Sequence, residues 1–110
     1  KRAACHWAWR DMLALFGAVP DPGRVVRDGN IITGGGVTAG IDFAFTVAAE
    51  LGGTALAQRL QLAIEYAPAP PFDSGRPETA PKEVLAAVEN QMAELLPARL
   101  AQAKEAAARL

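Results

Sequence analysis

Cys5 and His6 are the only cysteine and the only histidine in the chain, and they are adjacent. A cysteine nucleophile needs a base or a cation within hydrogen-bond reach to lower the pKa of its thiol. Neighbouring side chains in a strand point to opposite faces, so the two groups would meet only on a sharp strand-to-helix elbow flanked by small residues. Trp7 and Trp9 follow instead, which favours Cys5 as a buried structural thiol. His6 is either a packed strand histidine or the partner of a catalytic group outside this chain.

A second candidate site is the glycine-rich stretch 34–39, GGGVTA, which formally matches the G-x-G-x-x-A dinucleotide fingerprint. A dinucleotide site also needs a parallel strand after the following helix, ending in an acidic residue for the ribose. Here a second helix follows directly, so nucleotide binding is disfavoured. The glycines instead predict a close approach of the backbone to a neighbouring element, with amides exposed at a helix N-terminus. Asp42, in the first turn of that helix, is interpreted as a partner of the helix dipole.

Charge and composition exclude several classes of protein. The 110 residues carry 11 basic and 12 acidic side chains, a net charge of −1, so we expect neither nucleic acid nor an anionic membrane as partner. We find no apolar run long enough to span a bilayer and no secretory signal, and a single cysteine suits a reducing compartment, so we predict a cytoplasmic protein. One histidine and one cysteine do not fill a tetrahedral metal shell, and we expect no metal and no cofactor.

The elements that must position these residues follow from spacing and from turn signals. In chain order we first expect a strand over 2–7, a helix over 9–16 stopped by Gly17, and a hairpin of 24–27 and 30–33 around Asp28-Gly29. A helix capped by Thr38 and ended by Gly52-Gly53 follows, and then a second helix over about 54–65. A proline-rich extended segment over 66–81 leads to a last helix from Pro81, which Pro97 kinks or divides. The helix after Thr38 is apolar on several faces, which predicts burial on most sides.

One strand and one hairpin make a poor sheet. A buried strand normally pairs with parallel neighbours on both sides, and no such neighbours are encoded here. The chain also starts with Lys1 and enters a strand-like run almost at once. We therefore expect the missing strands to come from elsewhere and the chain to be part of a longer protein.

Four stretches together resemble a known family: ACHW at 4–7, RVVRDGN at 24–30, TGGGVTAGIDFA at 33–44, and QL at 61–62 with EYAPAPPF at 65–72. They resemble the C-terminal half of the ThiJ/PfpI superfamily, and within it the isonitrile hydratase-like group. The resemblance covers about residues 1–82, and it divides the chain into a C-terminal part of a ThiJ/PfpI domain and a helical extension over 83–110.

The resemblance implies an α/β fold, the C-terminal half of a flavodoxin-like, class I glutamine amidotransferase-like three-layer sandwich. It implies hydration of an isonitrile to an N-substituted formamide by a cysteine nucleophile that lies upstream of this sequence. His6 matches the strand histidine near that nucleophile, and Gly36, Val37 and Thr38 match the turn beside the substrate pocket. Cys5 stands where relatives often have Thr or Ser. The implied partners are a small-molecule substrate, a second copy in a homodimer, and the missing N-terminal half on which this part depends.

Two other functions stay open at this point. Similar domains sense ligands in AraC-type transcriptional regulators without turning them over. In PfpI-type amidases or deglycases the nucleophilic cysteine is itself followed by His, as Cys5 is followed by His6, although there a glycine comes next and here Trp7 does.

Overall fold

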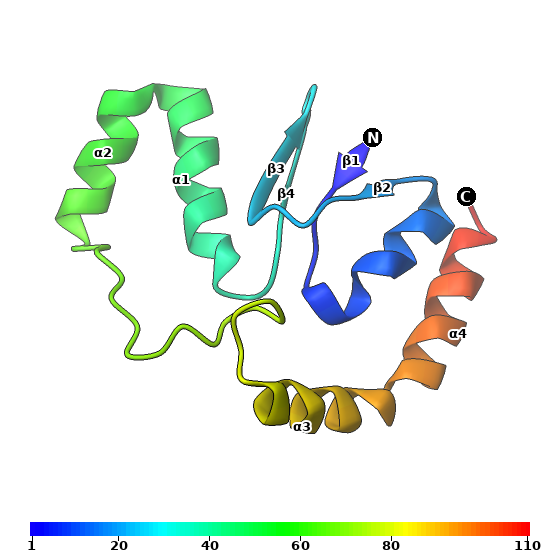
Figure 1. Cartoon of the computed structure of the whole chain (residues 1–110). Helices are drawn as coiled ribbons and strands as arrows, with labels where there is room; N and C mark the ends of the chain where they lie inside the picture. The colour runs from blue at the N-terminus through cyan, green and yellow to red at the C-terminus, as the bar shows by residue number, and fades with distance from the viewer.

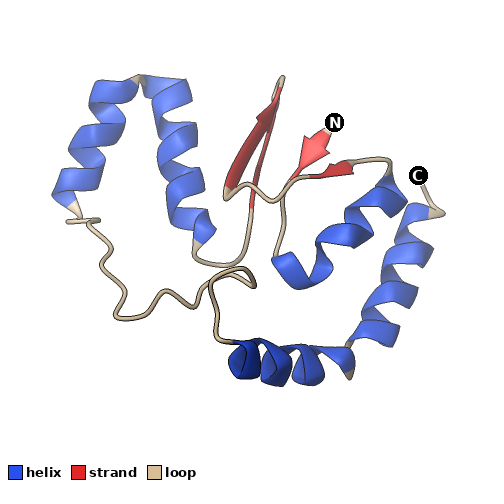
Figure 2. Cartoon of the chain, viewed as in Figure 1, coloured by secondary structure: helices blue, strands red, loops and turns tan.

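The computed structural model describes all 110 residues, and short strands alternate with a helix in the first third of the chain before helices take over (Figures 1 and 2). The elements in chain order are β1 (Arg2–Ala3), η1 (Trp7–Phe16), β2 (Val19–Pro20), β3 (Val25–Asp28), β4 (Ile31–Gly34), α1 (Ala39–Gly52), α2 (Thr54–Ala63), α3 (Lys82–Ala93) and α4 (Leu96–Ala107). The predicted mixed α/β class is confirmed.

The first strand is shorter than the expected run over 2–7. It pairs in parallel with β2, Arg2 opposite Val19. Its other side faces the β3–β4 hairpin, where the amide of Ala4 donates to the side-chain Oγ1 of Thr33 at 2.9 Å. The backbone ladder of β1 is with β2 alone, and the chain then turns into η1 at Trp7.

The expected helix over 9–16 is present, but it begins at Trp7 and is a 3₁₀-helix. Bonds between residues three apart mark both ends: the amide of Trp9 donates to the carbonyl of His6 at 3.0 Å, and that of Gly17 to Ala14 at 3.1 Å. Gly17 has a φ of 75°, a left-handed conformation that glycine adopts at little cost. The predicted stop at Gly17 is therefore confirmed.

The predicted hairpin is present, but both strands and the turn lie one residue later than the Asp28-Gly29 signal indicates. Strands β3 and β4 are antiparallel with Asp28 opposite Ile31, so Gly29 and Asn30 form the two-residue turn. Gly29 has a φ of 65° and Asn30 does not have a positive φ, which suits the turn type that places glycine first.

Helices α1 and α2 lie side by side and are separated by a break at Gly53, whose φ is 91° (Figure 1). The expectation that α1 is buried on most sides is wrong for this chain: only Ala39 is buried, and the side chain of Leu51 is 83% exposed. The apolar surface predicted from the sequence exists, and within the chain it is covered in part by the hairpin, by α2 and by the ring of Tyr66, which stacks on Phe45.

The proline-rich segment has no regular structure and leads from α2 to α3 along one edge of the molecule (Figure 1). Pro81 caps the start of α3, and Pro97 lies in the first turn of α4, where its missing amide donor costs nothing. The prediction that Pro97 divides the last helix is confirmed, and α4 returns to pack against η1.

The whole arrangement is flat and open. Its extents are 44 × 38 × 18 Å, its radius of gyration is 16.3 Å, and only five of 110 residues are buried, four of them alanines. A compact chain of this length has a radius of gyration of about 13 Å. No helix is long and apolar enough to cross a membrane.

Candidate functional site

His6 occupies the junction between β1 and η1, and its two ring nitrogens have different surroundings. It is the N-cap of η1, with φ −54° and ψ 136°, and its Nδ1 accepts a hydrogen bond from the amide of Ala8 at 3.2 Å. A neutral imidazole that accepts at Nδ1 carries its proton on Nε2. The ring is therefore set up as a hydrogen-bond donor through Nε2, and Nδ1 is occupied by the cap.

Gly36 lies directly against this ring. A Cβ atom placed on Gly36 would come within 3.3 Å of Cδ2 of His6, which is tight for a side chain. Cδ2 is bonded to Nε2, so the ring edge next to the turn is the edge that carries the donor. The structure thus brings together His6 and the 36–38 turn, two parts of the chain that sequence reasoning singled out separately.

The turn itself presents unused backbone donors. The amides of Ala39, Gly40 and Ile41 donate to carbonyls three residues earlier. The amides of Gly36, Val37 and Thr38 donate to no group of the chain. Three consecutive free N–H groups at the start of a 14-residue helix, where the helix dipole is positive, favour negative charge on a bound group.

Val37 and Thr38 are both exposed. The side chain of Val37 is 94% exposed, an isolated apolar group beside the turn. Thr38 is the N-cap residue of α1 as expected, but its hydroxyl makes no capping hydrogen bond. Its backbone is in the helical region, φ −73° and ψ −18°, and a side-chain cap needs an extended backbone there.

Cys5 lies next to His6 in sequence but does not contact its imidazole through a hydrogen bond. The thiol donates to the backbone carbonyl of His6, with Sγ 3.5 Å from the oxygen. Burial raises the pKa of the Cys5 thiol, and the nearby Arg10 cation lowers it by less. A raised pKa keeps the sulfur protonated near neutral pH, which is the opposite of what a cysteine nucleophile needs.

A polar network that sequence reasoning missed lies beside the turn. Oδ1 of Asp42 accepts a hydrogen bond from the Tyr66 hydroxyl, and Oδ2 accepts one from Nε of Arg24. These hydrogen bonds, from Tyr66 first and then from Arg24, lower the pKa of Asp42. The bond to Asp42 raises the pKa of Tyr66. The three residues are far apart in the chain, so no local pattern could have grouped them.

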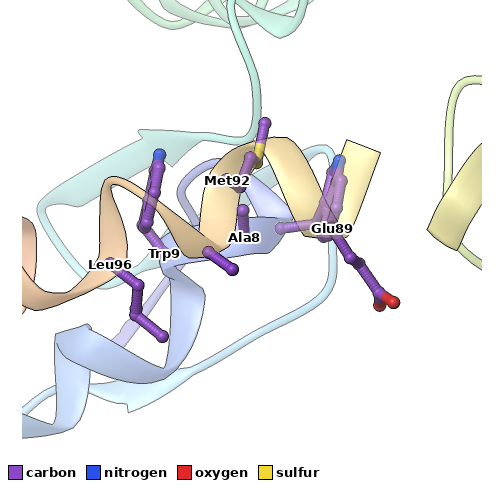
Figure 3. A pocket seen from close by; sticks show the side chains of 7 residues that line it. Ala8, Trp9, Glu89, Met92 and Leu96 are labelled. Carbon is purple, nitrogen blue, oxygen red and sulfur yellow. The ribbon is translucent and has the colours of Figure 1, made fainter. Parts of the chain in front are cut away.

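Away from this site, the 3₁₀-helix and the two C-terminal helices line an open, apolar hollow of about 280 Å³ (Figure 3). Its lining consists of Trp7, Ala8, Trp9, Glu89, Met92, Ala93 and Leu96. Glu89 is its only charged residue, and its carboxylate points away from the other labelled side chains. This hollow offers packing surface and no pair of groups that could move a proton.

The fold is that of a known class of α/β protein. The chain superposes on a ThiJ/PfpI family protein from Pseudomonas syringae with a TM-score of 0.84 and 45% identity, over 97% of this chain and 43% of the solved one. It is also 56% identical, over all 110 residues, to an isonitrile hydratase from Pseudomonas putida. No protein-family model matches the chain.

These two likenesses confirm the resemblance to the ThiJ/PfpI superfamily: the chain has the fold of a ThiJ/PfpI family protein and is a homologue of a protein named isonitrile hydratase. The chain spans 48% of the length of that hydratase. Both likenesses run past residue 82, while the predicted division at that position stays a prediction.

Proposed function

We propose that this chain is the C-terminal part of an isonitrile hydratase-like enzyme, in which it supplies one wall of the substrate pocket. The observation that carries the proposal is the 56% identity to an isonitrile hydratase along the whole chain. The contact between His6 and Gly36 supports it, because it joins the predicted site residues at one place.

The reaction adds water to an isonitrile, R–NC, and gives the formamide R–NH–CHO. In the proposed sequence, a cysteine thiolate outside residues 1–110 attacks the terminal carbon, forming a carbon–sulfur bond, and that carbon takes up a proton to give the thioimidate R–N=CH–S–Cys. Water then adds across the carbon–nitrogen double bond, its oxygen to the carbon and one proton to the nitrogen; the carbon–sulfur bond breaks, and the thiol leaves with the hydroxyl proton. Neither an oxidant nor a reductant is consumed.

The chain's own residues would act on the charge that develops during the attack. As the carbon–sulfur bond forms, one π-electron pair of the isonitrile becomes a lone pair on its nitrogen, and hydrogen-bond donors fixed in advance stabilise such a redistribution of charge. Nε2–H of His6 and the free amides of Gly36, Val37 and Thr38 are donors of this kind. Val37 adds an exposed apolar side chain that suits the hydrocarbon group of an alkyl isonitrile.

We further propose that the exposed surface is covered by the rest of the enzyme and by a second copy in a homodimer. The accessible surface is 7,955 Å². An ordinary folded monomer of 11.5 kDa exposes about 5,800 Å². The excess, roughly 2,000 Å² on this chain alone, is more than the about 800 Å² per partner of a standard interface and fits the larger interfaces of permanent complexes.

The direct test supplies an alkyl isonitrile to the protein that carries this chain and to residues 1–110 alone, and measures the formamide by mass spectrometry. We expect turnover by the former and none by the latter. Turnover by residues 1–110 alone would contradict the placement of the nucleophile outside them. A whole protein that binds isonitriles without converting them would contradict the enzymatic function and favour a ligand-sensing domain.

A further inference from the structure

Arg24 holds the 35–38 turn from both ends. Its backbone carbonyl accepts the amide of Gly35 at 2.9 Å, and its Nη2 donates to the carbonyl of Thr38 at 3.0 Å. The free amides of Gly36 and Val37 lie between these two contacts. The orientation of the Arg24 side chain therefore affects where those donors point.

The Arg24 side chain is in turn oriented by Asp42, and Asp42 by Tyr66. The carboxylate of Asp42 binds Nε of Arg24 with one oxygen and the Tyr66 hydroxyl with the other. Tyr66 is fixed independently: its ring stacks on Phe45 with centroids 5.4 Å apart, and its carbonyl accepts a bond from Gln61 at 3.0 Å. The contacts thus run from a fixed aromatic ring to the turn.

We propose that Asp42 is a positioning residue, which through Arg24 fixes the geometry of the donors at Gly36, Val37 and Thr38. The proposal rests on the proposed function for its catalytic consequence. The Asp42 carboxylate hydrogen-bonds to Arg24 and Tyr66 and not to the turn, and it would not touch substrate. Its effect on the reaction is indirect, because a small displacement of aligned groups lowers the rate even when binding persists.

The chain offers a matched control in Arg27 and Glu50. This ion pair, with Nη2 of Arg27 2.7 Å from Oε1 of Glu50, joins β3 to α1, and Arg24 lies immediately before β3. Its side chains are exposed to a similar degree, 53% and 48%, against 51% and 34% for Arg24 and Asp42. It lies near the other end of α1, away from the turn.

The experiment compares Asp42→Asn with Glu50→Gln in the protein that carries this chain. We expect Asp42→Asn to lower kcat about 10-fold or more with KM changed less than about 2-fold. We expect amide exchange at residues 36–38 to become faster. Glu50→Gln is expected to leave both unchanged. Equal kcat and equal exchange in the two variants would overturn the proposal.

Two additions keep the test decisive. If Asp42→Asn fails to fold, Tyr66→Phe removes only one hydroxyl from the network, and it should give the same kcat loss and faster exchange in milder form; a Tyr66→Phe variant that behaves like Glu50→Gln would overturn the proposal. If the wild-type protein does not convert isonitriles, the proposed function fails, and amide exchange alone then decides the positioning role.

Discussion

His6 uses its two ring nitrogens differently, and a pair of substitutions separates the two uses. His6→Asn keeps a good N-cap acceptor for the amide of Ala8 but loses the donor at Nε2. We expect it to retain stability and to lose most hydratase activity. His6→Ala loses both, and we expect a further destabilisation of about 1 kcal/mol. Thermal unfolding and turnover of the two variants measure these effects; full activity in His6→Asn would remove the imidazole from the mechanism.

Cys5 is expected to be dispensable. Its thiol bonds to a carbonyl and its pKa is raised by burial, so the reactive thiolate is scarce at neutral pH. We expect Cys5→Ser to retain turnover of an alkyl isonitrile within about 3-fold, roughly the loss expected from a sub-kcal/mol packing change. Complete loss of activity would instead support Cys5 as nucleophile, as in the amidase-like alternative.

Two glycines near the start of α1 are expected to respond in opposite ways to substitution by alanine. At Gly36, an added Cβ meets Cδ2 of His6 at 3.3 Å, so Gly36→Ala displaces the ring and should lower activity. At Gly40, a Cβ meets nothing within 4 Å, and the position is helical. Gly40→Ala should therefore stabilise the protein by up to about 1 kcal/mol and spare activity. Thermal melts and turnover rates check both; an active Gly36→Ala variant would show that the contact is not needed.

At the scale of elements, the Asp42–Tyr66 hydrogen bond joins the segment after α2 to the first turn of α1. We expect the contribution of this bond to the free energy of unfolding of the protein to fall at both extremes of pH. The pKa of Asp42 is lowered, so its contribution is complete above the ordinary carboxyl value of about 4 and is lost as pH falls through the lower folded value. The pKa of Tyr66 is raised, so its contribution is complete below about 10 and is lost as pH rises through the higher folded value.

This pH dependence is measurable because Tyr66 is the only tyrosine in the chain. The difference in ultraviolet absorbance between the protein and its Tyr66→Phe variant isolates the tyrosinate signal. We expect its midpoint above about 10, and closer to the ordinary value in Asp42→Asn. An unchanged midpoint in Asp42→Asn would contradict the assignment of the shift to Asp42.

Most elements could be predicted from the sequence because their signals are local. Gly17, Gly29 and Gly53 stop or turn the chain through positive φ values that glycine tolerates, and Pro97 starts a helix. What could not be predicted depends on distant contacts. The expected strand over 2–7 is shortened to β1, after which the amide of Ala4 donates to a threonine side chain of β4, and the Asp42 network joins three remote segments. Sequence reasoning found His6 and the 36–38 turn of the candidate site, but not Arg24 or Tyr66.

For the whole molecule, the sequence predicted unpartnered elements, and the structure has them. Large apolar side chains such as Leu62 and Phe72 are 82% and 77% exposed. We expect residues 1–110 alone to bind a hydrophobic dye strongly and to associate with increasing concentration. Fluorescence and size-exclusion chromatography measure this. A monomer that binds no dye would show that these faces are covered by rearrangement within the chain.

The 18 Å thickness of the molecule has a thermodynamic consequence. The strands lie between α1 and α2 on one side and η1 and α4 on the other (Figure 1), and the flat arrangement has two broad faces and almost no interior. The heat-capacity increase on unfolding comes from newly hydrated apolar surface, about 1.2–1.5 kcal/mol/K per 100 residues in an ordinary domain. In residues 1–110 most of the apolar surface is already exposed to water, so calorimetry of this segment alone should show only a small part of that heat-capacity increase. The remainder should appear in the protein that carries this chain, where partner surfaces cover these faces.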